Sequence, residues 1–496
     1  MAGDQQQEEA MAADPLHVVV FPWLAFGHLI PFLELSRRLA ARGHAVTFVS
    51  TPRNVARLPP VPEGLSGLVR TVALPLPAVD GLPEGAESTA DMSPEKVELL
   101  KAAFDGLAAP FADFLAAACA GGREQASGFG RRPDWVVLDF AHHWLCPIAE
   151  QHQVPCAMFQ IITATGLAYI GSRRQNVSHP RVTVEDFMPM PRWFPSPPSL
   201  TLRRHEAAWF AAAAQLNASG LADTERLWRT EERCRLLVVR SCPEVEQPRV
   251  FPLLQELNRK PVLPAGLLLP EDGLRETDGG HGDGTGAVVA RSGALQWLDE
   301  QPPGSVLYVA LGSEAPVTAA SVHELAVGLE LSGARFLWAL RAPSAAAAGT
   351  PLLPDGFEAR TRPRGVVCAG WVPQVRVLAH TAVGAFLTHS GWGSVAESLR
   401  FGLPLVMLPF MLDQGLIARM MAARGVGVEV ARRDDDGWFS RDDVAEAVRR
   451  VMVGEEGKTL ARNAMRLREA VVGDDGGRQE RYVDELVECF QRHRFT

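Results

Sequence analysis

Short apolar runs alternate with helical patterns along the first half of the chain. Residues 17–21, 45–50 and 135–138 are largely apolar and are bounded by polar or turn-forming residues, which is typical of buried strands. Residues 29–42, between the first two runs, repeat apolar side chains at helical spacing, and residues 203–231 also favour a helix. Strands that alternate with helices in this way predict a doubly wound parallel sheet of the α/β class.

The second half of the chain repeats this pattern after a segment of different composition. Residues 266–291 are rich in Gly, Asp and Thr, which indicates a flexible linker between domains. A strand is then predicted at residues 305–311, a helix at 317–331 and a strand at 335–340. Two α/β halves around a linker imply a cleft between them. Because open α/β sheets bind ligands beyond the carboxyl ends of their strands, we expect the functional site in this cleft.

Besides the linker, these patterns divide the chain into four parts. Residues 1–14 are polar and acidic and are predicted to form a disordered tail. An N-terminal domain is expected over residues 15–265, and a C-terminal domain over residues 292–475 after the linker. A last helix over residues 476–496 is expected to pack back on the N-terminal domain.

Composition and charge argue against several classes of function. The chain is 47% hydrophobic and 22% charged, with a formal net charge of −9, and an acidic balance without a basic stripe disfavours nucleic-acid binding. The cysteines show no C-x-x-C spacing, which favours a reducing compartment and no zinc module. The first residues lack the features of a signal peptide, and the longest apolar run, residues 403–412, is short and contains two prolines. We therefore expect a monomeric cytoplasmic protein without membrane insertion.

Residues 384–402 contain a strand that breaks at a glycine-rich turn and restarts as a helix. Exposed backbone N–H groups at such a helix start attract phosphate. In one interpretation Ser394 and Glu397 simply form a capping box, the common arrangement for this spacing. In the other, the Gly393 backbone and the Ser394 hydroxyl hold a diphosphate to which His389 donates. Glu397 would then accept a hydrogen bond from a ribose hydroxyl.

The wider segment from residue 371 to residue 414 favours the second interpretation. It begins W-x-P-Q, contains H-x-G-W-x-S-x-x-E and closes with Asp-Gln, and in these features it resembles the signature box of plant UDP-dependent glycosyltransferases. Residues 297–299, 310–314 and 336–341 are similar to other parts of that family. The resemblance implies two facing Rossmann-like domains, the GT-B arrangement, with an interdomain cleft. The N-terminal domain would bind the acceptor, and the C-terminal domain would bind the UDP-sugar.

The resemblance also implies a role for each matching residue of the box. Trp371 would stack on uracil, the Val372 backbone and Gln374 would hold the base and ribose, and Glu397 would take the ribose hydroxyls. The residues expected at the diphosphate are Ser313, His389 and Ser394, and those expected to line the sugar pocket are Trp392, Asp413 and Gln414. One position departs from the family pattern. The usual asparagine is replaced by Gly393, so an amide that helps to hold phosphate is missing, although the backbone N–H remains.

A second group of candidate catalytic residues lies in the first half of the chain. His28 stands in a G-H-x-x-P pattern between the first strand and its helix, where the helix start favours a neutral imidazole. The pattern resembles the catalytic histidine of the family. Asp139, which ends the strand at residues 135–138, would orient that histidine, because strand ends face the site in this fold. His142 and His143 compete nearby for a role at the acceptor site.

The function implied by the resemblance is an inverting transfer of glucose from UDP-glucose to a hydroxyl of a small molecule. The closing Asp-Gln favours glucose. Residues 22–28 and 50–54 look like the branch that adds a sugar to an existing glycoside. Its acceptors include flavonoid and terpenoid glycosides, among them steviol glycosides. A donor such as UDP-rhamnose, with an aglycone as acceptor, is the alternative within the family.

Other classes of function make different demands on the sequence. A nucleotide-sugar binding protein without turnover would not need His28 with Asp139. A dinucleotide-dependent oxidoreductase would carry G-x-G-x-x-G after the first strand, which is absent. The acidic run at residues 434–436 imitates a metal-binding D-x-D motif but is typical of a solvated loop before a helix. We therefore expect neither a metal ion nor a cofactor.

Overall fold

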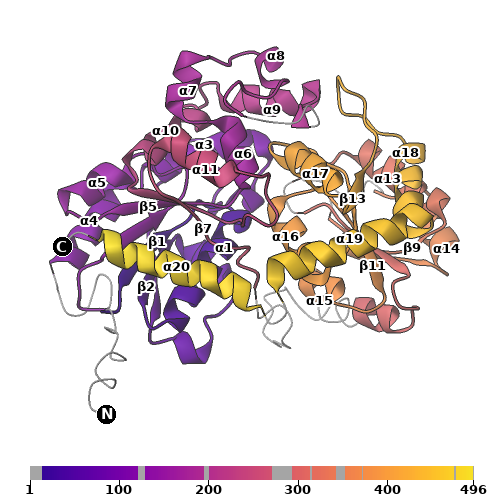
Figure 1. Cartoon of the computed structure of the whole chain (residues 1–496), viewed down its shortest axis with the longest axis horizontal. Coiled ribbons are helices and arrows are strands. Elements are labelled where there is room, and N and C mark those ends of the chain that lie inside the picture. The colour runs from indigo at the N-terminus through magenta and orange to yellow at the C-terminus, as the bar shows by residue number, and fades with distance from the viewer. Residues whose placement is uncertain are drawn as a thin grey trace, which may run out of the picture.

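The computed structural model describes residues 14–120, 129–194, 200–270, 293–312, 315–341, 352–370, 372–473 and 476–494. Within these residues the chain forms two parallel sheets with flanking helices, in two lobes that lie side by side (Figure 1). The first sheet has seven strands in the order β3-β2-β1-β4-β5-β6-β7, and the second has six in the order β10-β9-β8-β11-β12-β13. Strand order reverses between β1 and β4 and between β8 and β11, and such switch points are where open sheets bind ligands.

The N-terminal lobe contains the first sheet and its helices. Its strands are β1 (His17–Phe21), β2 (Ala45–Ser50), β3 (Val69–Ala73), β4 (Trp135–Leu138), β5 (Cys156–Gln160), β6 (Leu236–Val239) and β7 (Val262–Pro264). Its helices are α1 (Phe26–Ala41), α2 (Pro52–Arg57), α3 (Val97–Asp105), α4 (Ala108–Cys119), α5 (Leu145–Gln151), α6 (Ala164–Ile170), α7 (Arg173–Ser178), α8 (Val184–Phe187), α9 (Arg204–Ala213), α10 (Asp223–Arg233) and α11 (Val250–Asn258). Across the described ranges no single helix has the length and apolar character of a membrane span, although the bent pair at residues 94–105 and 108–119 passes by length and composition.

The C-terminal lobe contains the second sheet, and the chain ends in a helix that leaves this lobe. The strands are β8 (Val306–Ala310), β9 (Arg335–Leu340), β10 (Gly365–Ala369), β11 (Val383–Thr388), β12 (Leu405–Met407) and β13 (Gly427–Glu429). The helices are α13 (Ala319–Ser332), α14 (Phe357–Thr361), α15 (Gln374–Leu378), α16 (Trp392–Phe401), α17 (Gln414–Ala423), α18 (Arg441–Met452), α19 (Glu455–Val472) and α20 (Gly477–His493).

The three strands predicted in the first half coincide with β1, β2 and β4, so these predictions are confirmed. The helical pattern predicted over residues 203–231 is confirmed in part, because the range forms two helices with a turn between them. The chain leaves α9 after Ala213 and enters α10 at Asp223. Between them Gly220 adopts a φ of 77°, and its N–H donates to the Asn217 carbonyl at 2.8 Å, which closes a turn.

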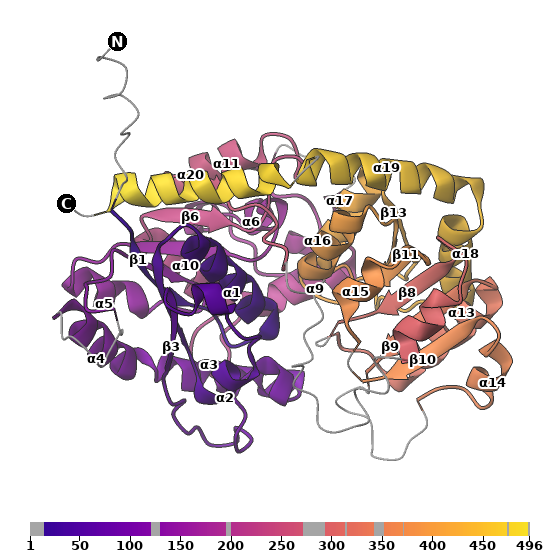
Figure 2. The ribbon, with the colours of Figure 1, turned by 90° about the horizontal axis from the view of Figure 1, so that it is seen from below.

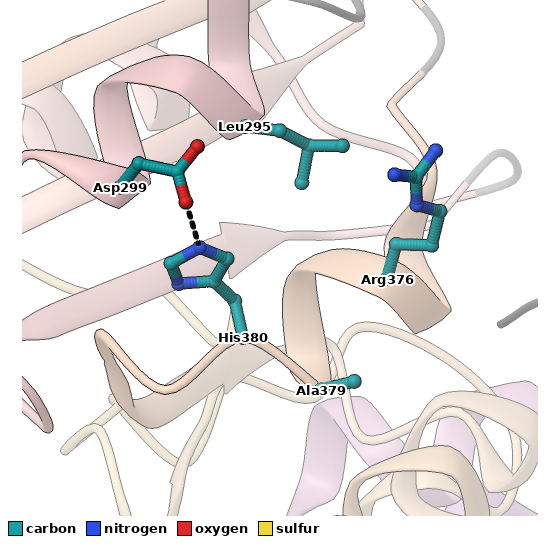
Figure 3. Close-up of a pocket in the computed structure, with 5 residues that line it drawn as sticks. All are labelled: Leu295, Asp299, Arg376, Ala379 and His380. Atoms are coloured by element: carbon teal, nitrogen blue, oxygen red, sulfur yellow. Dashed lines mark hydrogen bonds and ion pairs between the residues drawn. The ribbon is translucent and has the colours of Figure 1, made fainter.

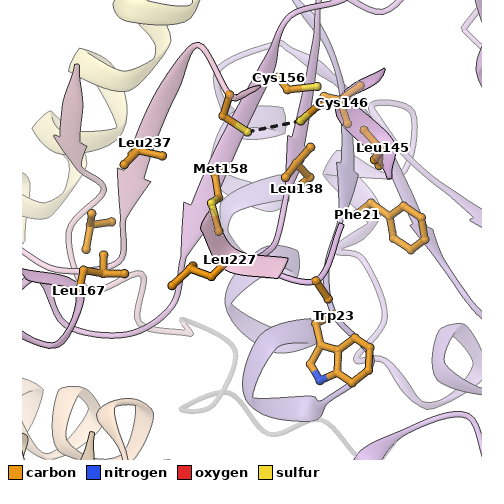
Figure 4. Packing of buried hydrophobic residues seen from close by; sticks show 14 of the residues in the cluster. Phe21, Trp23, Leu138, Leu145, Cys146, Cys156, Met158, Leu167, Leu227 and Leu237 are labelled. Atoms are coloured by element: carbon orange, nitrogen blue, oxygen red, sulfur yellow. Dashed lines mark hydrogen bonds between the residues drawn. The ribbon is translucent and has the colours of Figure 1, made fainter. Parts of the chain in front are cut away.

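The first sheet is buried on both faces. Val19 and Phe21 of β1 belong to the apolar cluster on one face, where Leu138 also lies (Figure 4). Val18 and Val20 belong to the cluster on the other face. Successive side chains of a strand point to opposite faces, so a strand covered on both sides reads as one continuous apolar run. All seven cysteines are free.

The last two helices run along one side of both lobes (Figure 2). α19 packs against α16 in the C-terminal lobe, and α20 continues onto α1 and β7 of the N-terminal lobe. There the Trp135 ring stacks on Phe490, with ring centroids 4.9 Å apart. The described start of the predicted linker also lies under α20: Leu267 is fully buried and its N–H donates to Gln479 Oε1 at 2.7 Å. The chain from residue 266 is therefore packed before it enters the segment outside the described residues.

Helix α9 of the N-terminal lobe forms ion pairs with the C-terminal lobe. Glu206 is buried and accepts from Arg419 Nη2 of α17 at 2.7 Å. Its neighbour Arg203 donates to Glu429 Oε2 of β13, also at 2.7 Å. These contacts join the two lobes, and α17 also packs against α6 of the N-terminal lobe.

Candidate active site

His28 and Asp139 meet at the switch point of the first sheet. β1 and β4 are parallel neighbours in which Phe21 pairs with Leu138, so the residues that follow both strands emerge at the same edge. His28 is the third residue of α1, and Asp139 directly follows β4. His28 Nδ1 lies 2.6 Å from Asp139 Oδ2. The structure thus brings together the two residues predicted to form a histidine–carboxylate pair.

Asp139 is almost completely buried, yet it is held in the ionised form. Its Oδ2 also accepts from the Trp23 N–H at 3.0 Å, and its Oδ1 accepts from the Phe140 N–H at 2.7 Å. Burial alone would raise the pKa of this carboxyl, but His28 and the Trp23 N–H lower the pKa below its ordinary value. A carboxylate at Nδ1 keeps the proton on that nitrogen and leaves the lone pair on Nε2 of His28. The His28 side chain is 19% exposed.

The two competing histidines lie in different surroundings. His142 is fully buried against Phe21 and Phe104, with ring centroids 4.7 and 4.8 Å apart. Desolvation lowers the pKa of His142 to about 3, so it is neutral. His143 is partly exposed, and its Nδ1 lies 3.8 Å from Asp105 Oδ1. His142 is thus part of the aromatic core, and only His143 has access to solvent.

The glycine-rich turn after β11 leads into α16 three residues earlier than the capping-box interpretation requires. Gly391 is the N-cap residue, and the helix begins at Trp392. Ser394 is therefore already inside the first turn, and no side-chain capping bond forms. The capping box is wrong because the backbone turns into the helix directly after Ser390, whose φ is 66°. Ser394 and Glu397 are left available for other partners.

The side chains predicted to hold the nucleoside cluster beside α16. Gln374 Nε2 donates to Glu397 Oε2 at 2.7 Å and lies 3.4 Å from Ser394 Oγ. The Tyr308 hydroxyl lies 3.4 Å from Gln374 Oε1, and Val372, two residues before Gln374, is buried. Burial raises the pKa of Glu397. Gln374 thus orients the carboxylate that was predicted to accept from a ribose.

His389 packs between two glycines at the carboxyl ends of β8 and β11. A Cβ on Gly312 would lie 2.7 Å from His389 Cε1, and a Cβ on Gly391 would lie 2.3 Å from Nε2, so both positions require glycine. Desolvation lowers the pKa of His389 to about 4, which leaves a neutral ring with one N–H donor. Two other predicted members of the site, Ser313 and Trp371, lie outside the described residues.

The Asp-Gln pair after β12 forms the start of α17. Asp413 is the N-cap residue, and its Oδ2 is buried without a hydrogen-bond partner in the described structure. Burial raises the pKa of Asp413 to about 6. Gln414 Oε1 accepts from the Phe410 and Met411 N–H groups at 2.9 and 3.1 Å. This leaves the Gln414 amide nitrogen, next to an unsatisfied carboxylate oxygen, as a hydrogen-bond donor.

Asp413 faces the N-terminal lobe. A Cβ on Gly166, in the first turn of α6, would lie 3.6 Å from Asp413 Cβ and 3.7 Å from its Oδ2. Asp413 and His28 also interact electrostatically across the cleft. The packing of the two lobes therefore places an unsatisfied carboxylate from one lobe near the histidine–carboxylate pair of the other.

Trp392 and Gly393 contact the N-terminal lobe through Arg240. The Trp392 indole is 4% exposed, and its Nε1 donates to the Arg240 carbonyl at 2.6 Å. The polar edge of Trp392 is thus already bonded, and the ring packs between the lobes. A Cβ on Gly393 would lie 3.6 Å from Arg240 Nη1.

Two buried charged residues after β6 were missed by the sequence analysis. Arg240 directly follows this strand, and Glu246 lies six residues further on. Glu246 accepts from the Ala164 and Thr165 N–H groups at 2.7 and 3.0 Å and from Ser241 Oγ at 2.5 Å, which fixes the start of α6. Both residues could have been predicted from the sequence, because they follow the apolar run at 236–239 and strand ends face the ligand site in this fold.

A separate cavity of about 300 Å³ lies beside α15 (Figure 3). Its lining residues are Leu295, Asp299, Arg376, Ala379 and His380. His380 Nε2 lies 3.2 Å from Asp299 Oδ1, and the Asp299 side chain is 74% exposed. No predicted site residue lines this cavity, so it lies apart from the cleft described above.

The acidic run at residues 434–436 forms part of an exposed turn before α18. Asp436 pairs with Arg433 in that turn, and the Asp434 side chain is 81% exposed. Where the chain is described, no group of three or more His, Cys, Asp or Glu side chains is arranged to hold a metal ion.

Known proteins are similar to this chain along nearly its whole length. The family described as "UDP-glucoronosyl and UDP-glucosyl transferase" matches residues 295–472. UDP-glycosyltransferase 91D1 of Stevia rebaudiana is 41% identical over 96% of this chain and 93% of its own length. Soyasaponin III rhamnosyltransferase of Glycine max is 34% identical over 97% of this chain and 96% of its own length.

The structure of Os79 from O. sativa in complex with UDP is similar to this structure, with a TM-score of 0.74. It is 25% identical in sequence, over 95% of this chain and all of that chain. The predicted α/β fold, with two facing Rossmann-like domains, is confirmed. With these identities over almost its full length, the chain belongs to the plant family 1 UDP-dependent glycosyltransferases and is a sugar-transferring enzyme of the GT-B fold.

Proposed function

We propose that this enzyme transfers glucose from UDP-glucose to a hydroxyl of a small-molecule acceptor, with inversion at the anomeric carbon. The observation that carries the proposal is the His28–Asp139 pair, 2.6 Å apart, opposite Asp413 in the other lobe. Such a displacement requires a general base on one side of the donor sugar and a polar sugar pocket on the other. The acceptor is an existing glycoside of a terpenoid of the steviol type or of a flavonoid.

The reaction uses His28 Nε2 as the base. Nε2 takes the proton of the acceptor hydroxyl, and Asp139 stabilises the imidazolium that forms. The acceptor oxygen forms a bond to the anomeric carbon from the face opposite UDP while the bond from that carbon to the diphosphate oxygen breaks. A single displacement through an oxocarbenium-like state converts the α-linked donor into a β-linked glucoside.

The donor lies along the C-terminal lobe in this proposal. Trp371 and Val372 hold the base, and Gln374 and Glu397 hold the ribose. The residues at the diphosphate are Ser313, His389, Ser394 and the Gly393 backbone. The first turn of α16 supplies the positive end of a helix dipole to the departing UDP. Asp413 and Gln414 hydrogen-bond the glucose hydroxyls, and Trp392 forms the wall beside them through its packed ring.

Transfer is expected to proceed without a divalent cation. The helix start and neutral hydrogen-bond donors around the proposed diphosphate site supply the stabilisation that a metal ion gives in other sugar transferases. The measurement is the transfer rate in excess EDTA, compared with the rate in added Mg²⁺ or Mn²⁺. Full loss of activity in EDTA that is restored by either ion would overturn this proposal and direct attention to residues 434–436.

Replacing Asp413 by asparagine is expected to cut glucose transfer roughly ten- to a hundredfold, the usual effect of losing a hydrogen bond to a charged partner. UDP affinity should stay close to that of the wild type, because the proposed UDP contacts lie elsewhere. The measurements are transfer rates with UDP-glucose and UDP-galactose, and UDP affinity by calorimetry. Asp442→Asn, an exposed substitution in α18, is the matched control. Wild-type preference for UDP-galactose, or weakened UDP binding by Asp413→Asn, would count against a glucose pocket here.

The same substitution should raise the stability of the unliganded protein at neutral pH. Because the Asp413 pKa is raised from 3.8 to about 6, the folded state binds this proton more tightly than the unfolded state. Stability contributed by the group is therefore lost as pH rises from about 4 to about 6. Asp413→Asn should have a higher Tm than the wild type at pH 7.5, and the difference should shrink as pH falls below 6.

A UDP-rhamnose donor is the alternative, because one relative is named as a rhamnosyltransferase. A nucleotide-sugar binding protein without turnover is the alternative outside catalysis. A panel of UDP-sugars against terpenoid and flavonoid glycosides, with products identified by mass spectrometry and UDP release measured in parallel, separates these possibilities. A glucosylated glycoside is the expected product, whereas UDP-sugar binding without UDP release would support the binding protein.

A further inference from the structure

Arg240 is a buried cation that reaches from the N-terminal lobe to the start of α16. It directly follows β6, and its backbone N–H donates to the Gln160 carbonyl at 2.8 Å. Its backbone carbonyl accepts from Trp392 Nε1. Its side chain is held by one bond, from Nε to the Leu267 carbonyl at 2.9 Å, and the residue is 4% exposed. Main chain and Nε thus hold the guanidinium in place at the junction of the two lobes.

The two Nη groups of Arg240 have no hydrogen-bond or ion-pair partner in the described residues. Burial lowers the pKa of Arg240 to about 10, while Glu397 and Glu34 raise it, so the side chain is charged at neutral pH. A guanidinium carries four N–H bonds on its Nη atoms, which makes it a strong donor toward an anion from outside the chain. An anion that accepts hydrogen bonds from these N–H groups would stabilise the buried charge of Arg240.

The space beside this guanidinium is open because residue 393 is glycine. A Cβ on Gly393 would lie 3.6 Å from Arg240 Nη1, so any longer side chain would enter the region next to the cation. Gly393 is the second residue of α16, where backbone N–H groups point out of the helix start. Ser390, just before the N-cap residue, has a buried Oγ that also lacks a partner in the described structure. The Arg240 guanidinium and the unsatisfied Ser390 hydroxyl therefore both lie near the positive end of one helix.

We propose that Arg240 binds the diphosphate of the nucleotide sugar at the start of α16, in place of the asparagine amide that Gly393 lacks. The inference rests on the proposed function, in which this helix start holds the diphosphate. It adds a contact from the N-terminal lobe to a site otherwise built from the C-terminal lobe. Guanidinium groups suit this role because they bind phosphate oxygens in pairs and remain charged when buried.

The test compares the affinity for UDP with the affinity for uridine, which lacks phosphate, by calorimetry. Arg240→Gln should weaken UDP binding roughly ten- to a hundredfold, the usual cost of losing a hydrogen bond to a charged group, and should leave uridine binding unchanged. Adding Gly393→Asn to this variant should restore part of the UDP affinity, because an amide then occupies the space beside the phosphate. Arg424→Gln is the matched control, since this arginine also crosses between the lobes but donates to the Glu246 carbonyl.

Each outcome has a defined meaning. Equal affinity of wild type and Arg240→Gln for UDP overturns the inference, as does an equal loss for UDP and uridine, which would indicate a purely structural role. If Arg240→Gln does not fold, Arg240→Lys keeps the charge, and a lower affinity for UDP alone then supports the contact, whereas unchanged affinity overturns it. Wild-type protein that binds no UDP refutes the proposed function itself, and transfer activity with an unaffected Arg240→Gln variant refutes only this inference.

Discussion

A His28→Ala enzyme is expected to retain UDP binding and to lose roughly 10²–10⁴-fold in turnover, which is the usual contribution of a general base. The physical reason is the 2.6 Å contact with Asp139 at Nδ1, which directs the lone pair of Nε2 away from the carboxylate. Alanine removes the only part of this pair that can take a proton from the acceptor. UDP affinity should not change, because His28 makes none of the proposed UDP contacts.

The measurements for His28 are single-turnover transfer rates and UDP affinity on the same preparation. His380→Gln is the control, because this histidine pairs with Asp299 away from the cleft. A His28→Ala enzyme with near-normal turnover would remove His28 from the mechanism. Loss of UDP affinity in parallel with turnover would instead show that the substitution disturbs the cleft as a whole.

Asp139→Asn is expected to reduce turnover by a similar factor, although His28 is still present. In the wild type the carboxylate only accepts, so Nδ1 carries the proton. An asparagine amide can donate to Nδ1, which moves the ring proton to Nε2 and leaves no lone pair for the acceptor hydroxyl. The corresponding change in the serine-protease triad costs about 10⁴-fold, and we expect a loss of roughly 10²–10⁴ here.

Two further measurements separate this effect from damage to the fold. Asp139 also accepts from the Trp23 and Phe140 N–H groups, so Tm should be compared for the wild type and Asp139→Asn. The double variant with His28→Ala should be no slower than the slower single variant, because the two residues act as one unit. Multiplicative losses in the double variant, or near-normal turnover of Asp139→Asn, would contradict this assignment.

The sequence alone was sufficient to predict the strands whose apolar pattern is local. The strands at residues 17–21, 45–50 and 135–138 are covered on both faces, and double burial leaves a continuous apolar run that can be read directly. The approach of His28 to Asp139 was also predictable, because residues that follow neighbouring parallel strands emerge at the same edge. The signature box identified the family because its spacing is specific over many residues.

Only the tertiary structure decided which polar groups at the cleft already have partners. Trp392 donates to a carbonyl 152 positions away in sequence, and the open space at Gly393 is bordered by Arg240 from the other lobe. The capping box at Ser394 failed because a turn at Ser390 started the helix earlier. Local patterns indicate the burial and spacing of neighbouring residues. A hydrogen-bond partner that comes from a distant strand end cannot be inferred from them. The satisfaction of each hydrogen bond in the cleft therefore depends on how the two lobes pack together.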